Sequence, residues 1–271
     1  MIKIATIAGS DASGGAGLEA DLKTFEEYGL YGMTAVTVIA TMDPDNNWAH
    51  GVFPIDEQTL KAQLETIFKG VGVSAAKSGM LGTFHAVELT REYISAYSIK
   101  NYVLDPVMIC KGNDEALNPE LNQAIAEKLL PLAKVVTPNL FEAAQLSGME
   151  EIASVERMKE AAKIIAGRGA ANVFIKGGSK LPNPTEALDL LYDGTHFELI
   201  KRPFIKTTWT HGAGCTVAAA ITSGLARGLS VYDAIVLAKK FISQNLEGSF
   251  PLNSWVGPGN PTNWRKNTLF T

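Results

Sequence analysis

The run Thr210-His211-Gly212-Ala213-Gly214-Cys215-Thr216 combines an expected anion site with an ionisable side chain. An apolar stretch of helical character follows directly, so the backbone N–H groups of residues 212–215 lie where a loop turns into a helix. A helix N-terminus carries roughly half a positive charge and attracts anions such as phosphate. The pKa of the Cys215 thiol is expected to fall there. This combination suits phosphoryl transfer to a hydroxyl group; a glycine C-cap before a new helix is the alternative.

A second glycine-rich segment runs from Gly9 to Gly17 and joins a predicted strand to a predicted helix. Such a turn indicates close approach of the backbone to a ligand. The segment has neither the G-x-G-x-x-G spacing of a dinucleotide site nor the lysine of a Walker A loop. Asp11 within it can accept a hydrogen bond from a substrate hydroxyl, or it can cap the start of the helix.

Charged and amide side chains follow three further predicted strands. Asp105 ends one strand, where a carboxylate suits Mg²⁺ bound with water and phosphate oxygens. Asn139 and Glu142 follow another strand, three residues apart on one helical face, although an N-cap pair has the same pattern. Lys176 ends a third strand and precedes Gly177-Gly178, an arrangement that can reach phosphate oxygens. Together with the two glycine-rich segments, these residues predict one phosphate-handling site.

The order of the predicted elements indicates the fold class. Strands are predicted at 2–8, 36–40, 75–78, 102–105, 135–137 and 172–176, and helices at 18–28, 56–69, 83–97, 119–130, 154–168, 214–226 and 231–247. Asp193-Gly194 between 187–192 and 195–200 predicts a hairpin with a type I′ turn. Alternating strands and helices predict an α/β protein with a mostly parallel sheet, helices on both faces and one domain over residues 1–271. The site should lie beyond the carboxyl ends of the strands.

The bulk properties narrow the function. The net charge is −4 and the basic residues are scattered, which argues against a nucleic-acid partner. No apolar stretch approaches the roughly 18 residues of a membrane span, and no signal peptide is visible, so we expect a cytoplasmic protein without a membrane partner. The two cysteines, Cys110 and Cys215, are too few for a disulfide framework and are expected to be free thiols.

These motifs, in this order over nearly the whole chain, resemble the ribokinase superfamily, and within it the branch of hydroxymethylpyrimidine and pyridoxine kinases. The residues that carry the resemblance are Gly9 to Gly17, Asp105-Pro106-Val107, Thr137-Pro138-Asn139-x-x-Glu142, Lys176-Gly177-Gly178 and Gly212 to Thr216. The resemblance implies a three-layer α/β/α sandwich, ATP and Mg²⁺ as cofactors, K⁺ as a further ion, and a homodimer. Sugar kinases of the superfamily have Asp as the base where this chain has Cys215, and Cys resembles the hydroxymethylpyrimidine branch.

The resemblance also implies residue roles. The predicted catalytic residues are Gly212, Ala213, Gly214, Cys215 and Lys176. The predicted substrate-binding residues are Asp11, Gly15, Met42, His50, Met80, Val107 and Cys110. The predicted ATP-binding residues are Asn139, Glu142, Lys176, Gly177, Gly178, His211, Ala213 and Lys239, and the predicted metal ligands are Asp105 and Glu142.

Two positions favour a B6 vitamer as substrate. Hydroxymethylpyrimidine kinases typically have Gln where this chain has Met42, and Met cannot satisfy the polar edge of an aminopyrimidine. Cys110 lies in a predicted flap, where a thiol can add reversibly to the aldehyde of pyridoxal; a small apolar flap residue is the alternative. We therefore expect an ATP-dependent kinase for the 5′-hydroxymethyl group of pyridoxal, pyridoxine or pyridoxamine. A hydroxymethylpyrimidine (phosphate) kinase and a non-catalytic B6 or nucleotide sensor are the alternatives.

Overall fold

The structure is a computed structural model that describes residues 1–108, 119–178, 180–181 and 186–265. Cys110 lies outside the described residues. No helix within these ranges is long and apolar enough to cross a membrane.

One nine-stranded sheet forms the centre of the molecule, in the order β3-β2-β1-β4-β5-β6-β7-β8-β9. The strands are β1 (Lys3–Asp11), β2 (Tyr31–Asp43), β3 (Ala49–Pro54), β4 (Ala75–Ser78), β5 (Tyr102–Leu104), β6 (Val135–Val136), β7 (Val173–Ile175), β8 (Glu186–Tyr192) and β9 (Phe197–Pro203). Neighbours from β2 to β7 pair in parallel, whereas β2–β3, β7–β8 and β8–β9 pair antiparallel. The sheet is therefore mostly parallel, as predicted.

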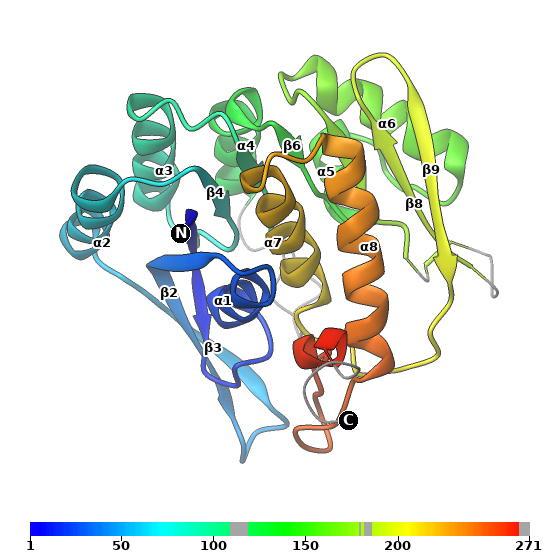
Figure 1. The fold of residues 1–271 in the computed structure, drawn as a ribbon, viewed down its shortest axis with the longest axis horizontal. Coiled ribbons are helices and arrows are strands. Elements are labelled where there is room, and N and C mark those ends of the chain that lie inside the picture. The colour runs from blue at the N-terminus through cyan, green and yellow to red at the C-terminus, as the bar shows by residue number, and fades with distance from the viewer. Residues whose placement is uncertain (109–118, 179, 182–185, 266–271) are drawn as a thin grey trace.

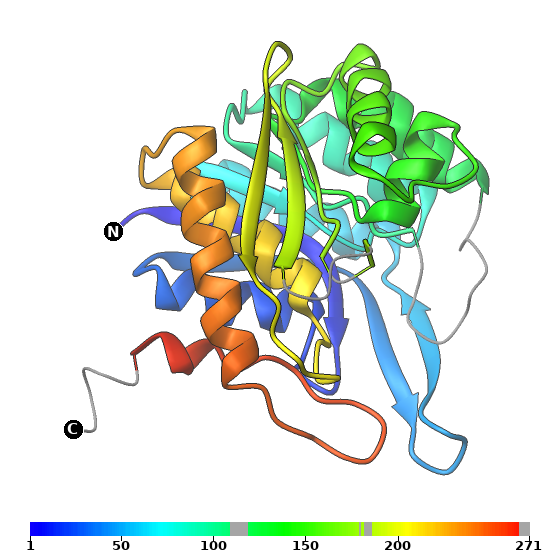
Figure 2. The ribbon, with the colours of Figure 1, turned by 90° about the vertical axis from the view of Figure 1, so that its right-hand side faces the viewer.

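Helices cover both faces of the sheet (Figures 1 and 2). One face carries α1 (Gly17–Glu27), α7 (Ala213–Ala226) and α8 (Val231–Glu247). The other carries α2 (Glu57–Leu64), α3 (Phe84–Ala96), α4 (Pro119–Lys128), α5 (Leu140–Ser147) and α6 (Val155–Gly167). Each layer has its own apolar core because successive strand side chains point to opposite faces of the sheet. The predicted three-layer sandwich is confirmed, also by its similarity to solved structures.

The helix boundaries follow from local capping. Thr83, the predicted cap of α3, accepts a hydrogen bond from the Ala86 N–H. Ser154 caps α6 in the same way, by accepting from the Arg157 N–H. These side chains satisfy N–H groups that have no partner within the helix.

Three predicted elements differ from the structure. The predicted type I′ hairpin turn is wrong: Tyr192 pairs with Phe197, so the loop has four residues. The Asp193 carboxylate accepts from the N–H groups of Thr195 and His196 and holds this longer loop. The helix predicted over 56–69 is α2 followed by a π-helical segment, Glu65–Val71. The strand predicted at 2–8 continues through Gly9 to Asp11.

The long strand β2 and the short β3 form a hairpin that extends beyond the neighbouring strands (Figures 1 and 2). β3 was not predicted, because a six-residue strand with an internal glycine has little periodic signal.

The chain order places a switch point beside β1. From β1 the chain moves outward to β2 and β3, then returns to pair β4 on the other side of β1. At such a point the connections leave in opposite directions and a crevice opens beyond the carboxyl ends of the strands.

Candidate active site

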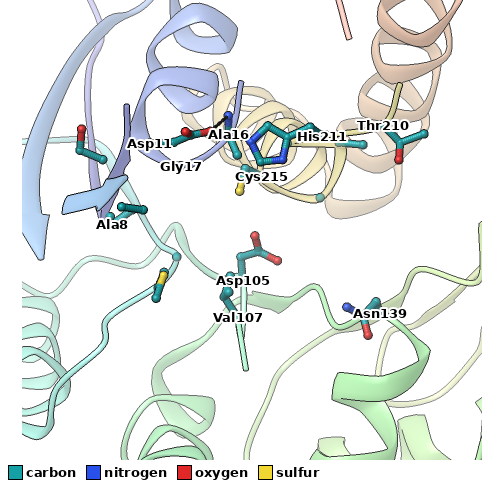
Figure 3. Close-up of a pocket in the computed structure, with 18 of the residues that line it drawn as sticks. Ala8, Asp11, Ala16, Gly17, Asp105, Val107, Asn139, Thr210, His211 and Cys215 are labelled. Carbon is teal, nitrogen blue, oxygen red and sulfur yellow. Dashed lines mark hydrogen bonds and ion pairs between the residues drawn. The ribbon is translucent and has the colours of Figure 1, made fainter. Parts of the chain in front are cut away.

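A cavity of about 250 Å³ lies at this switch point. The predicted site residues that line it are Asp11, Met42, His50, Met80, Asp105, Val107, Asn139, Glu142, Lys176, His211, Gly212, Ala213, Gly214 and Cys215. Figure 3 shows Asp11 and Cys215 on one side of the cavity and Asp105 and Val107 on the other. The tertiary structure thus brings together residues that the sequence distributes over 200 positions.

Four described residues of the predicted site do not line this cavity. Gly15 packs against the His211 ring: a Cβ on Gly15 would lie 2.5 Å from His211 Cδ2. Gly177 and Gly178 pack beside β8: a Cβ on Gly177 would lie 2.3 Å from the Leu188 carbonyl oxygen, and the Gly178 N–H donates to Asp189. Lys239 forms a buried ion pair with the same Asp189, with 2.5 Å between its Nζ and Oδ2.

The anion site is the first turn of α7. Gly212 caps this helix in the left-handed conformation, at φ 74°, which glycine adopts without strain. A Cβ at Gly212 would lie 1.9 Å from the Gly15 carbonyl oxygen, so the two glycine-rich segments touch backbone to backbone. The N–H of Thr216 donates to the Gly212 carbonyl. This is the first hydrogen bond within α7. The N–H groups of Gly214 and Cys215 lie before it in the chain and have no acceptor within the helix, so they can hold an anion.

A buried hydrogen bond from His211 to Asp11 joins the two segments. His211 Nε2 lies 2.6 Å from Asp11 Oδ2, and the same carboxylate accepts from the N–H groups of Ser13 and Ala16. Burial alone would raise the pKa of Asp11, but the hydrogen bonds from His211 and Ser13 and the nearby His211 charge lower it to about 2. Asp11 is therefore ionised, and it organises the loop that the sequence analysis placed at a ligand.

The predicted low pKa of Cys215 is wrong for the free protein. Burial raises the pKa of its thiol to about 11, even though Lys77 acts to lower it. The negative charges of Asp105 and Asp21 add to the rise. Cys215 is half-buried at the cavity wall. The helix N-terminus is one contribution to its pKa among several, and the desolvation of the thiol by the surrounding protein outweighs it.

Asp105 and Lys176 form an ion pair on the opposite side of the cavity. Lys176 Nζ lies 3.0 Å from Asp105 Oδ1, which also accepts from the Thr137 hydroxyl at 3.1 Å. Burial would raise the pKa of Asp105, but the charges of Lys176 and Lys77 hold it below its ordinary value. Asp105 is a carboxylate, and Lys176 is placed beside it.

Asn139 and Glu142 form a complete capping box at the start of α5, which is the pattern noted as the alternative to a ligand site. The Asn139 N–H donates to the Glu142 carboxylate at 2.8 Å, and the Glu142 N–H donates back to Asn139 Oδ1 at 2.9 Å. Both residues also line the cavity, so capping does not exclude a ligand role. Burial, with a smaller contribution from Asp105, raises the pKa of Glu142 to about 7 although Lys176 acts to lower it.

The β2–β3 hairpin supplies the apolar side of the cavity. Met42 and His50 pair directly across the two strands, and both line the cavity. The sequence analysis singled out both residues, but their pairing depends on β3.

Lys77 on β4 is a cavity-lining residue that the sequence analysis missed. Its side chain is fully buried and forms an ion pair with Asp21 of α1 at 2.9 Å. A lysine within the short predicted strand 75–78 is the signal that could have identified it, because lysines are rarely buried unless they are paired.

Comparison with known proteins agrees with this geometry. The family model described as phosphomethylpyrimidine kinase matches residues 11–260. The pyridoxine kinase of Bacillus subtilis is 56% identical, over 95% of each chain. The hydroxymethylpyrimidine/phosphomethylpyrimidine kinase of the same organism is 38% identical, over 100% of this chain and 98% of that one. The structure of Staphylococcus aureus pyridoxal kinase in complex with AMP-PCP and pyridoxal matches with a TM-score of 0.93 and 43% identity, over 98% of this chain and 96% of that one.

The fold and the cavity define a kinase of the ribokinase-like α/β class. The chain belongs to the phosphomethylpyrimidine kinase family. The predicted resemblance is thereby confirmed.

Protonation of Asp11 should destabilise the fold. Its folded-state pKa of about 2 lies below the ordinary 3.8, so its contribution is fully present above pH 4 and disappears as the pH falls through 2. A shift of this size corresponds to about 2 kcal/mol of unfolding free energy at neutral pH. We expect Asp11→Asn to lower the free energy of urea unfolding by about that amount at pH 7, and by progressively less between pH 4 and pH 2.

The exposed Asp45, changed to Asn, is the control and should leave the unfolding free energy unchanged at every pH. If Asp11→Asn lowers the unfolding free energy by the same amount down to pH 2, the charge of the Asp11 carboxylate does not contribute to stability.

Proposed function

We propose that this chain transfers the γ-phosphoryl group of ATP to the 5′-hydroxymethyl group of pyridoxal, pyridoxine or pyridoxamine, with Cys215 at the reacting hydroxyl. The observation that carries the proposal is one cavity in which the first turn of α7 and Cys215 lie with Met42 of the β2–β3 hairpin. The α7 N–H groups suit the charge of a phosphoryl group, and Met42 suits an apolar ring edge.

The relatives confirm the predicted activity class, an ATP-dependent kinase for B6 vitamers. A structural neighbour holds both an ATP analogue and pyridoxal, which also confirms that ATP and a small-molecule substrate are the partners of such an enzyme. These relatives disfavour the sensor alternative. The pyrimidine alternative is weaker because the pyridoxine kinase is 56% identical and the hydroxymethylpyrimidine kinase 38%.

Cys215 acts on the hydroxyl in one of two ways. As a thiolate it takes the hydroxyl proton while the oxygen attacks the γ-phosphorus and the bond to ADP breaks. As a thiol it orients the hydroxyl by hydrogen bonding during deprotonation. The pKa of about 11 leaves the thiol protonated in the free protein at neutral pH, so the first route requires a local charge that favours the thiolate. The N–H groups of Gly214 and Cys215 stabilise the transferring phosphoryl group.

The residues present fit Mg²⁺. Asp105 and Glu142 are buried carboxyl groups that line the cavity, and burial, with a smaller contribution from the charge of Asp105, raises the pKa of Glu142. A divalent cation relieves this repulsion, and Mg²⁺ is typically held by one or two carboxylates with phosphate oxygens and water. When bound, the ion neutralises the charge of the ATP phosphates. Lys176 holds Asp105 in place and presents its ammonium to the same phosphates.

The K⁺ ion, the homodimer and the cytoplasmic location stay predictions. The exposed apolar pair Ile39 and Phe53, which face each other across the β2–β3 hairpin, supports a surface of this hairpin as the contact between subunits.

Removing the sulfur should abolish most turnover and leave binding intact. A positioned base contributes about 10²–10⁴-fold, so we expect Cys215→Ala to lower kcat with pyridoxal by a factor in this range. ATP and pyridoxal affinities, measured by calorimetry, should remain close to those of the wild type. Near-normal kcat in this variant would show that Cys215 only packs, and Asp11 would be the next residue to test as the base.

Substrate choice should depend on Met42. We expect higher kcat/KM for pyridoxal than for hydroxymethylpyrimidine, measured by coupled ADP release. Met42→Gln should shift this ratio toward the pyrimidine by about 1–3 kcal/mol, because the amide can pair with the polar ring edge.

The matched control is Tyr31→Gln, at the opposite, exposed end of the same strand, and it should leave the ratio unchanged. Higher kcat/KM for the pyrimidine than for every B6 vitamer in the wild type would overturn the substrate assignment.

Metal dependence should change when Glu142 loses its charge. Gln at this position can still accept from the Asn139 N–H and preserve the capping box, so Glu142→Gln isolates the charge. We expect the Mg²⁺ concentration for half-maximal turnover to rise on the order of tenfold. Glu92→Gln, on the exposed face of α3, is the control. An unchanged Mg²⁺ requirement in Glu142→Gln would remove this residue from the metal site.

A further inference from the structure

The buried pair of Lys77 and Asp21 lies on the same side of the sheet as Cys215. Lys77 of β4 and Thr6 of β1 occupy matched positions on neighbouring parallel strands, so their side chains point to the same face. Both bond the same oxygen of Asp21 on α1: the Thr6 hydroxyl donates at 2.6 Å and the Lys77 ammonium at 2.9 Å. This face also carries α7, whose first turn contains Cys215.

The Lys77 ammonium has more donors than partners within the described residues. An ammonium group has three N–H donors, and the only hydrogen bond described for it goes to Asp21. The side chain is fully buried and also lines the cavity. Burial alone would lower the pKa of Lys77, but the Asp21 charge outweighs burial and keeps the pKa above its ordinary value, so the group is a cation. Its remaining N–H groups can interact with a negatively charged group in the cavity.

Stability alone does not account for this pair. Removing two charges from water costs several kcal/mol per ion, and apolar residues of similar volume are often neutral or stabilising in their place. Asp21 is also incompletely satisfied, because its Oδ1 is buried and accepts no hydrogen bond within the described residues. A pair that apolar residues could replace without loss of stability, but that places a cation at the cavity, has a use in the site itself.

We infer that Lys77 is a positioning residue for the proposed reaction: its ammonium, held by Asp21 and Thr6, favours negative charge on the Cys215 sulfur. The charged groups that act on Cys215 from the surrounding elements are Lys77 of β4, Asp105 after β5 and Asp21 of α1, and Lys176 after β7 also interacts with it. The two aspartates oppose the thiolate and Lys77 favours it. Lys77 thus offsets part of the effect of burial and of the two aspartates, and without it the thiolate would be less accessible still. This inference rests on the proposed role of Cys215.

The test measures thiolate formation directly, without ATP or vitamer. The chain has two cysteines, so a Cys110→Ser background leaves Cys215 as the single thiol for iodoacetamide, with mass spectrometry as the readout. The alkylation rate follows the thiolate fraction, partly offset by the greater nucleophilicity of a more basic thiol. In this background we expect Lys77→Met to slow alkylation at pH 8.5 about three- to fivefold, because the smaller thiolate fraction outweighs the gain in nucleophilicity.

Two controls separate charge from structure. Lys77→Arg keeps the cation and should retain the background rate within a factor of about two. Thr6→Val removes the other hydrogen bond to Asp21 without changing any charge. Its alkylation rate should also stay within a factor of about two of the background rate. An equal slowing in Thr6→Val and Lys77→Met would indicate structural damage and overturn the inference, as would an unchanged rate in Lys77→Met.

A double variant keeps the test valid if Lys77→Met does not fold. Lys77→Met with Asp21→Asn removes both charges and leaves no unpaired carboxylate. Because Asp21 opposes the thiolate less than Lys77 favours it, the double variant should still slow alkylation, by a smaller factor than Lys77→Met alone. A rate equal to that of the background would overturn the inference. Because no substrate is present, this result is independent of the kinase assays, and failure of the proposed function would appear only in those.

Discussion

The active site depends on the close contact between the loop after β1 and the N-terminus of α7. A Cβ on Gly212 would meet the Gly15 carbonyl oxygen, and a Cβ on Gly15 would meet the His211 ring. His211 also bonds Asp11 over a sequence separation of 200 residues. This contact orients the free N–H groups of α7 toward the cavity and fixes Cys215 beside them. Without it, the glycines of both segments would form flexible loops and the helix N-terminus would point at no particular ligand position.

Around this contact the cavity is lined by charges that are paired before any ligand binds. Lys176 forms an ion pair with Asp105 on one side of the cavity. Lys77 forms an ion pair with Asp21 on the side that carries Cys215. Each pair keeps a cation close to the place where phosphate or a deprotonated group would lie. The burial that makes these pairs costly also raises the pKa values of Glu142 and Cys215, so the free site holds less negative charge than its sequence implies. Such a site is suited to receive ATP, which brings its own negative charge.

The hairpin of β2 and β3 adds the part of the site that distinguishes substrates. Met42 and His50 face each other at the end of a strand pair that reaches beyond the rest of the sheet. The phosphate-handling side is built from strand ends and helix termini of the common fold, whereas this side depends on two side chains of one hairpin. A change of substrate therefore requires few substitutions, which accords with the family containing both pyridoxine kinases and hydroxymethylpyrimidine kinases.

The sequence by itself determined the elements whose signals are local. The apolar run of β1, the caps of α3 and α6 and the glycine-rich entry to α7 can be identified from neighbouring residues alone, because periodicity and capping act within a few positions. The motif order also predicted the layers and most of the cavity residues. Only the tertiary structure decided the length of the β8–β9 loop, the pairing of Met42 with His50, the place of Lys239 away from the cavity and the participation of Lys77. It also reversed the expected pKa of Cys215, because burial and the charges of residues distant in sequence act through space, and no local pattern contains them.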